Sequence, residues 1–170
     1  MKPVIRVLND MVRDGVVQGY AVGGATALLY FSKPTFTEDI DVFIRIERSA
    51  SALVDLSSVY AYLAEKKGAV VRGEHVLIEG YPVQFLVPYD DLSEEAFQKA
   101  VPVSLGGSRF RVFDLEYLMA IMVQLGKEKY RERLRILFQS RTFQEKKLQR
   151  ILKRFHLIQR WNKLKKGLKG

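Results

Sequence analysis

The sequence predicts an α/β protein with a helical C-terminal extension. Short apolar runs alternate with segments of helical periodicity over the first part of the chain, as in α/β folds. Residues 20–44 predict a strand, a double-glycine turn, a helix, a polar loop and a second strand. Beyond Asp114 all segments have helical periodicity. We therefore expect two regions, one over residues 1–113 and a basic helical one over residues 114–170.

The N-terminal elements follow from periodicity and from helix-breaking residues. A helix is expected over residues 3–14, because its apolar positions share one face and Pro3 suits a first turn. A strand over residues 19–22 comes next, then a helix from the double glycine to about Phe31. A strand carrying two aspartates runs to about Arg45.

The middle of the chain predicts one long helix and several short strands. The helix covers residues 53–67 and stops at Gly68, since glycine is typical of helix C-termini. Three adjoining strands, a helix and a hairpin are then expected at residues 69–72, 75–79, 81–87, 92–99, and 101–105 with 109–113. Gly73-Glu74, Glu79-Gly80 and Gly106-Gly107-Ser108 are typical turn sequences.

The C-terminal region predicts four helices that pack on the rest of the protein. Asp114 is typical of a helix N-cap. The expected helices cover residues 115–125, 128–138, 143–155 and 157–166. Apolar residues recur along them at helical spacing, which favours a packed cap over a free arm.

Composition favours a protein of a reducing compartment, and we expect a cytoplasmic location. The 170 residues contain no cysteine, which excludes disulfides and thiolate metal sites. The N-terminus lacks the pattern of a secretory signal. Gly15–Ser32 holds no charged residue, but its glycines and polar residues favour a buried strand–turn–helix over a membrane span, so no membrane partner is expected.

Positive charge is concentrated in the C-terminal helices. The formal net charge is +9, made up of +13 from Lys127 onward and −4 before it. Such asymmetry indicates an anionic partner for the helical region, for example RNA. A well-solvated helical face is the alternative explanation.

The candidate site lies within residues 20–44. Asp39 and Asp41 are two residues apart on a predicted strand, so their side chains project from the same face. Gly23-Gly24 allows backbone amides to approach an anion just before a helix begins. Phosphate-binding amides beside two carboxylates are typical of a metal–nucleotide site.

Both features also have a purely structural explanation. The two acids could stand by chance at a strand end, and the glycines could form a tight turn without a ligand. Against this, like charges on one strand face repel each other. A bound Mg²⁺ (or Mn²⁺) removes that cost, because such ions take oxygen ligands from carboxylates and phosphates.

The glycine pair, the spacer over residues 25–38 and the acid–apolar–acid strand resemble the signature of the DNA polymerase β-like nucleotidyltransferases. Thr37, two residues before the first acid, resembles the abortive-infection, toxin-type branch of that superfamily. The resemblance implies a small mixed sheet flanked by helices. It also implies an NTP substrate and transfer of a nucleoside monophosphate to a hydroxyl of RNA, such as tRNA, or of a protein. An antitoxin is a further implied partner.

The resemblance also assigns roles around the triphosphate. Gly23, Gly24, Thr26 and either Ser32 or Lys33 would lie near it. Thr37 is expected to fix the loop that enters the acid strand, since its hydroxyl can bond local backbone. Many relatives carry Arg where this chain has Thr35, so Lys33 is the nearest basic candidate.

A second departure concerns catalysis. The third carboxylate of the superfamily falls at Gln84 in this sequence, and an amide cannot serve as a general base. Glu79 and Asp90 are possible substitutes. A degenerate, non-catalytic module that binds a nucleotide or RNA is therefore the alternative function.

Basic residues crowd the start of the second C-terminal helix. Lys127 and Arg131 share a face at i,i+4 spacing and are the pair we expect toward the nucleotide. Glu128 and Glu132 could instead neutralise this cluster. His75 and His156 are expected to be ordinary surface groups.

Overall fold

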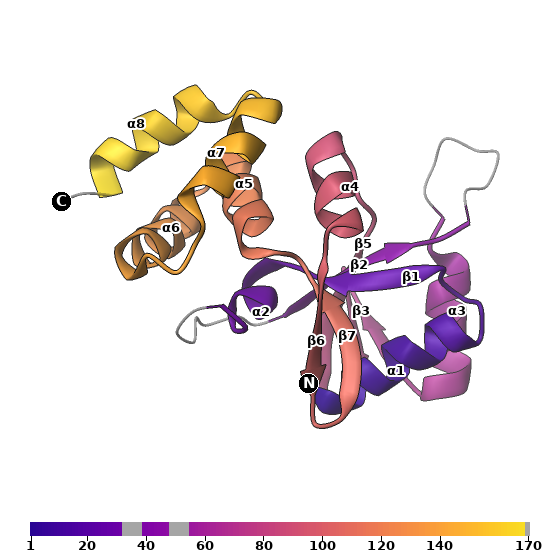
Figure 1. Ribbon diagram of the computed structural model, residues 1–170. Helices are drawn as coiled ribbons and strands as arrows, with labels where there is room; N and C mark the ends of the chain where they lie inside the picture. Colours follow the sequence, from indigo (N-terminus) through magenta and orange to yellow (C-terminus); the bar gives the residue numbers. More distant parts are fainter. Residues whose placement is uncertain (32–38, 48–54, 169–170) are drawn as a thin grey trace.

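The computed structural model describes residues 1–31, 39–47 and 55–168. Within them the chain forms a seven-stranded mixed sheet and helices on and beyond it, so the predicted α/β class is confirmed (Figure 1). Ser32, Lys33, Thr35 and Thr37 lie outside the described residues.

The sheet has the order β3-β4-β5-β2-β1-β7-β6. Its strands are β1 (Gly19–Val22), β2 (Ile40–Arg45), β3 (Val70–Arg72), β4 (His75–Ile78), β5 (Tyr81–Leu86), β6 (Val101–Leu105) and β7 (Ser108–Val112). The pairs β2–β5 and β1–β7 are parallel, and the other neighbours are antiparallel. β2 therefore lies at the centre of the sheet, between β5 and β1.

The helices differ in where they pack. They are α1 (Lys2–Arg13), α2 (Gly24–Leu28), α3 (Ser57–Lys67), α4 (Asp91–Gln98), α5 (Leu115–Leu125), α6 (Glu128–Ser140), α7 (Glu145–Arg154) and α8 (Ile158–Leu168). α1 and α3 pack against the sheet, and α5 to α8 gather beyond one end of it (Figure 1).

Apolar spacing explains why α1 forms at the predicted position. Val4, Ile5, Leu8 and Met11 recur every three or four residues and are almost completely buried. Their face of the helix packs against β1, β4 and β7. Pro3 lies in the first turn, as expected.

Two predicted helices differ at their ends. The helix after the double glycine is regular only to Leu28, because the amides of Leu29, Tyr30 and Phe31 bond carbonyls three residues back and form a tighter turn. The helix expected from residue 53 begins at Ser57. Asp55 accepts a hydrogen bond from the Ser57 backbone N–H at 2.8 Å and so satisfies one of the free N–H groups of the first turn.

α5 connects the sheet to the C-terminal helices. It contacts α2 and α4 on one side and α6, α7 and α8 on the other, and most of its side chains are buried. The C-terminal helices are thus a packed cap, as predicted. None of the helices in the described part of the chain has the length and apolar content for a membrane crossing.

Candidate metal–nucleotide site

A pocket of about 330 Å³ opens between the central strand β2 and the helices α5 and α6. Asp39, Asp41 and Gln84 line the sheet side of this pocket, and Gly24 lines it from the start of α2. Lys127, Lys129 and Arg133 line it from the opposite side. The fold therefore brings carboxylates and cations from distant parts of the sequence to one cavity.

Asp39 and Asp41 reach the same pocket, as their spacing predicted. Asp39 precedes the first residue of β2, and Asp41 is the second residue of that strand. His75 on β4 lies beside them, with its Nε2 atom 3.2 Å from Oδ2 of Asp39. This contact shows that the expectation of an ordinary surface group at His75 was wrong. It could not be predicted, because no local pattern around this residue indicates it.

The electrostatics of Asp41 are unusual for a carboxyl group. Burial and, after it, the negative charge of Asp39 raise the pKa of Asp41 to about 6. The positive charges of Lys129, Arg133 and His75 lower it, but they do not offset those two effects. Burial therefore makes the charged form of Asp41 costly even with these cations nearby.

The two glycines are required for different reasons. A Cβ atom on Gly23 would lie 2.6 Å from the ring of Phe43. On Gly24 it would lie 1.7 Å from Oδ2 of Asp41, and Gly24 also has a φ of +54°. The double glycine thus lets the start of α2 approach the second carboxylate closely.

Thr26 has a positioning role in this structure. It is buried, and its hydroxyl donates a hydrogen bond to the backbone carbonyl of Asp39 at 3.3 Å. It does not line the pocket, although the resemblance implied a place near the triphosphate. The bond ties α2 to the residue directly before β2.

Gln84 lies where the third carboxylate was expected. In the parallel pairing of β2 and β5 it stands directly beside Asp41, and it lines the same pocket. Its Nε2 atom donates to Oε2 of Glu74 at 3.4 Å. Glu74, in the turn between β3 and β4, is a carboxylate near the site that sequence reasoning did not consider.

Neither proposed substitute for the third carboxylate lines the pocket. Asp90 caps α4 by accepting a hydrogen bond from the Ser93 backbone N–H at 2.8 Å, and it also accepts one from Gln124. Glu79 is exposed in the turn between β4 and β5. Asp90 is thus occupied by a structural role.

Helix α6 presents a different face to the pocket than the sequence predicted. Lys127 does line it, but Arg131 does not; its guanidinium lies 3.1 Å from Glu128 instead. Lys129 and Arg133 take the place expected for Arg131, with Tyr130 between them. They share i,i+4 spacing too, so spacing alone could not decide between the two faces.

The described residues do not contain three His, Asp or Glu side chains already gathered around one point as a metal cage. Asp39 and Asp41 are therefore a two-carboxylate site. Mg²⁺ is commonly held in this way, by one or two carboxylates and the phosphates of a substrate. The buried carboxyl group of Asp41 beside Asp39 fits such an ion, because a bound cation offsets the cost of its charged form.

Comparison with known proteins supports the fold. No protein-family model matches the sequence, and neither does any curated protein. Among solved structures, the chain is similar to an antigenic nucleotidyltransferase-like protein from Paracoccidioides brasiliensis. The TM-score is 0.55 at 18% identity, over 98% of this chain and 90% of the other. The protein therefore has a nucleotidyltransferase-like fold.

A Thermotoga maritima protein provisionally described as a nucleotidyltransferase is also similar. Its TM-score is 0.49 at 18% identity, over 81% of this chain and 91% of the other.

Proposed function

We propose that this protein is a divalent-metal-dependent nucleotidyltransferase that moves a nucleoside monophosphate from an NTP to an acceptor hydroxyl. One observation carries the proposal: Asp39 and Asp41 face cationic side chains across a single pocket, and the pKa of Asp41 is raised by burial and by Asp39. A protein with no ligand for these acids gains nothing from holding them together.

Asp39 and Asp41 are the residues that would hold Mg²⁺ or Mn²⁺, and the amide oxygen of Gln84 is a third oxygen beside them. Such a metal, when bound, neutralises phosphate oxygens and favours attack at phosphorus. Their position in a partly buried pocket strengthens the attraction between these carboxylates and a cation.

The other pocket residues would bind the triphosphate. Lys127, Lys129 and Arg133 supply positive charge opposite the acids, and Arg133 can bond two phosphate oxygens at once. Gly24 lets the Asp41 carboxylate lie against the backbone at the start of α2, beside the place proposed for the phosphates. Thr26 keeps Asp39 in place by its hydrogen bond to the Asp39 carbonyl.

The acceptor and the biological role are also part of the proposal. An RNA such as tRNA, or a protein, would be drawn to the basic C-terminal helices. The similarity of the motif around Thr37 to the toxin-type branch supports a toxin role with an antitoxin partner, acting in the cytoplasm.

Gln84 favours a second function, a non-catalytic module that binds a nucleotide or RNA. It stands at the position beside Asp41 where a general base would be needed. An amide cannot take the proton from an attacking hydroxyl.

A labelling screen separates the two functions. The protein is incubated with each of the four NTPs carrying a radiolabelled α-phosphate, with Mg²⁺ or Mn²⁺, and with total RNA or total protein. If the protein is an enzyme, one acceptor should become labelled only when the metal is present. The Asp39→Asn, Asp41→Asn double variant should not label that acceptor. Metal-dependent binding of an NTP without any transfer would identify the binding module.

A further inference from the structure

The two aspartates of the site are positioned differently. Asp41 lies within β2, in register with Gln84 on β5, and its carboxylate is packed against Gly24. Asp39 comes before the strand, and 33% of its side chain is exposed. Within the residues that the structure describes, the pairing of β2 with β5 begins at Ile40. The strand ladder therefore positions Asp41 directly but does not reach Asp39.

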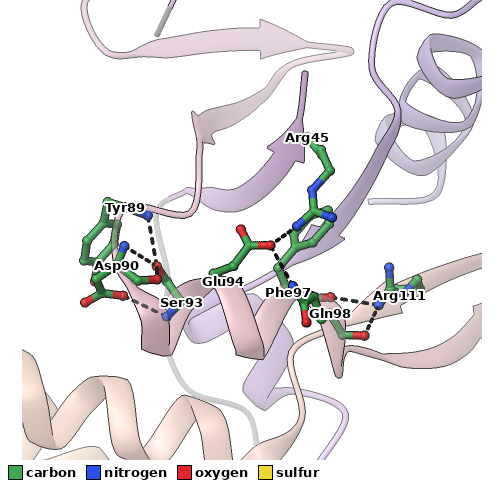
Figure 2. A network of polar contacts seen from close by, with 8 residues as sticks. All are labelled: Arg45, Tyr89, Asp90, Ser93, Glu94, Phe97, Gln98 and Arg111. Carbon is green, nitrogen blue, oxygen red and sulfur yellow. Dashed lines mark hydrogen bonds and ion pairs between the residues drawn. The ribbon is translucent and has the colours of Figure 1, made fainter. Parts of the chain in front are cut away.

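The other end of β2 is anchored by side chains. Arg45, its last residue, pairs with Glu94 on α4, and its guanidinium lies over the ring of Phe97, 4.8 Å from the ring centroid (Figure 2). The guanidinium of Arg111 lies 5.6 Å from the same centroid, and Phe97 is buried. The strand is thus fixed along its ladder and at its C-terminal end. Its start, where Asp39 stands, needs contacts of its own.

Thr26 and His75 supply such contacts. The Thr26 hydroxyl donates to the backbone carbonyl of Asp39 at 3.3 Å, and Nε2 of His75 lies 3.2 Å from Oδ2 of the same residue. An ionised carboxylate only accepts hydrogen bonds, so Nε2 of His75 is the donor. The first bond places the backbone of Asp39, and the second orients its carboxylate.

The register of β4 determines that His75 faces the site. Val76 and Ile78 are buried, and His75 projects from the opposite face of the strand. Glu74, the residue before it, accepts a hydrogen bond from Gln84 at 3.4 Å. Two consecutive residues at the β3–β4 turn therefore contact polar side chains that line the pocket. His75 itself does not line it, so it can influence a ligand only through Asp39.

We propose that His75 is a positioning residue of the metal site: its hydrogen bond to Oδ2 holds the Asp39 carboxylate in the orientation that binds the divalent ion. The inference rests on the proposed function and adds a residue that the resemblance did not assign. Carboxylates that bind metals are themselves held by hydrogen bonds, and loss of such a partner typically weakens metal binding by about 10- to 100-fold.

The test is calorimetric titration of the full chain with each of the four NTPs in turn, once with Mg²⁺ and once with EDTA. The ratio of the two affinities is the readout. His75→Leu removes the donor and should lower this ratio by about 10- to 100-fold, with the affinity in EDTA unchanged. His75→Gln places an amide N–H near the position of Nε2 and should restore most of the ratio. A loss of stability alone would lower both affinities together.

Arg72→Gln is the matched control. Arg72 is exposed and stands opposite His75 in the pairing of β3 and β4. Removing its positive charge cannot weaken the binding of a cation electrostatically. The ratio should therefore stay the same or rise in this variant.

Nuclear magnetic resonance of the imidazole rings gives a second readout, because the chain contains only two histidines. In the unchanged protein, Nε2 of His75 should carry a proton before and after Mg²⁺ and an NTP are added. The signals of His75 should change in Asp39→Asn. His156, in the turn between α7 and α8, is the internal reference and should show no change.

An unchanged ratio in His75→Leu overturns the inference, and so does a loss in His75→Gln as large as in His75→Leu. Loss of the Nε2 proton when Mg²⁺ and an NTP bind would make His75 a ligand of the ion; the positioning role then fails and the proposed function stands. If His75→Leu does not fold, His75→Gln and the imidazole signals decide. Failure of the unchanged protein to bind any NTP more tightly with Mg²⁺ rejects the proposed function and this inference together.

Discussion

The carboxyl group of Asp41 links the stability of the fold to its proposed function. Its pKa rises from the ordinary 3.8 to about 6 in the folded protein, because it is buried and lies beside Asp39. Between those values the folded protein keeps a proton that the unfolded chain releases. The contribution of Asp41 to the free energy of unfolding therefore falls as pH rises from about 4 to about 6.

Asp41→Asn removes this pH-dependent cost. We expect the variant to be more stable than the unchanged protein at pH 7 by about 1–3 kcal/mol, since one unit of pKa corresponds to about 1.4 kcal/mol. The difference should vanish below about pH 4, where both side chains are neutral. Urea unfolding at several pH values measures it.

Asp55→Asn is the control, because the hydrogen bonds from Ser57 lower the pKa of Asp55 and its effect has the opposite sign. It should give no gain in stability at pH 7. An Asp41→Asn variant with the same advantage at pH 4 as at pH 7 would contradict the account.

We expect Gln84 to limit the rate of the proposed reaction. Gln84→Asp or Gln84→Glu should leave NTP affinity similar and raise the rate of transfer, because general-base assistance typically contributes about 10²–10⁴-fold. Gln84→Asn, which keeps the amide, should not raise the rate. The measurement is single-turnover transfer of labelled nucleotide. A folded Gln84→Asp variant with an unchanged or lower rate would rule out a missing base as the limitation.

At the scale of elements, the start of α2 is shaped around Asp41. Gly24→Ala should lower the free energy of unfolding, because its positive φ costs about 1–2 kcal/mol for other residues. It should also weaken Mg²⁺-dependent NTP binding, since the new Cβ atom must displace the Asp41 carboxylate. Calorimetry and urea unfolding measure the two effects.

Gly73→Ala is the control that separates the backbone strain at a positive φ from the displacement of the Asp41 carboxylate. Gly73 has a φ of +60° and no atom within 4 Å of an added Cβ, so it carries only the backbone cost. It should lose stability and keep NTP affinity. Equal NTP binding by the two variants would show that Gly24 is not part of the site.

Most elements could be predicted because their signals are local. Apolar spacing defined α1, and Gly68 and Gly126 stop α3 and α5 in left-handed conformations. The shared orientation of Asp39 and Asp41 could also be predicted, because side chains alternate between the two faces of a strand. An observed helix start differed from the predicted one where a side chain bonds the backbone, as Asp55 does before α3.

The rest of the site depends on contacts between distant segments. The pairing of Asp41 with Gln84 and the contact of His75 with Asp39 are set by strand register across the sheet. Whether Arg131 or Arg133 faces the pocket depends on the direction in which α6 leaves Gly126. A local pattern carries no information on either point.

For the whole molecule, the C-terminal helices carry the excess positive charge while also belonging to the core. Leu148, Leu152 and Trp161 are buried, and Lys147 on α7 bridges the N-cap residue Asp114 and Glu116 of α5 at 2.6 and 2.9 Å. Removal of residues 127–170 would therefore expose apolar surface. Charge substitutions are the better test of this region.

Lys146, Arg150 and Lys153 form an exposed stripe on α7. If the helices bind a polyanion, log affinity for RNA falls linearly with log salt, and replacing all three by Gln should make that dependence shallower. Lys66→Gln on α3 is the control and should leave the slope unchanged. A salt-independent affinity, or an equal slope in the triple variant, would indicate that these residues are only a solvated face.

The most direct test of the metal–nucleotide site is calorimetric titration of an NTP into the unchanged protein and into the Asp39→Asn, Asp41→Asn double variant, each with and without Mg²⁺. We predict that Mg²⁺ strengthens NTP binding to the unchanged protein. We also predict that this gain is absent from a double variant that remains folded and is at least as stable. The same NTP affinity with Mg²⁺ in both proteins would contradict the assignment of Asp39 and Asp41 as the metal site.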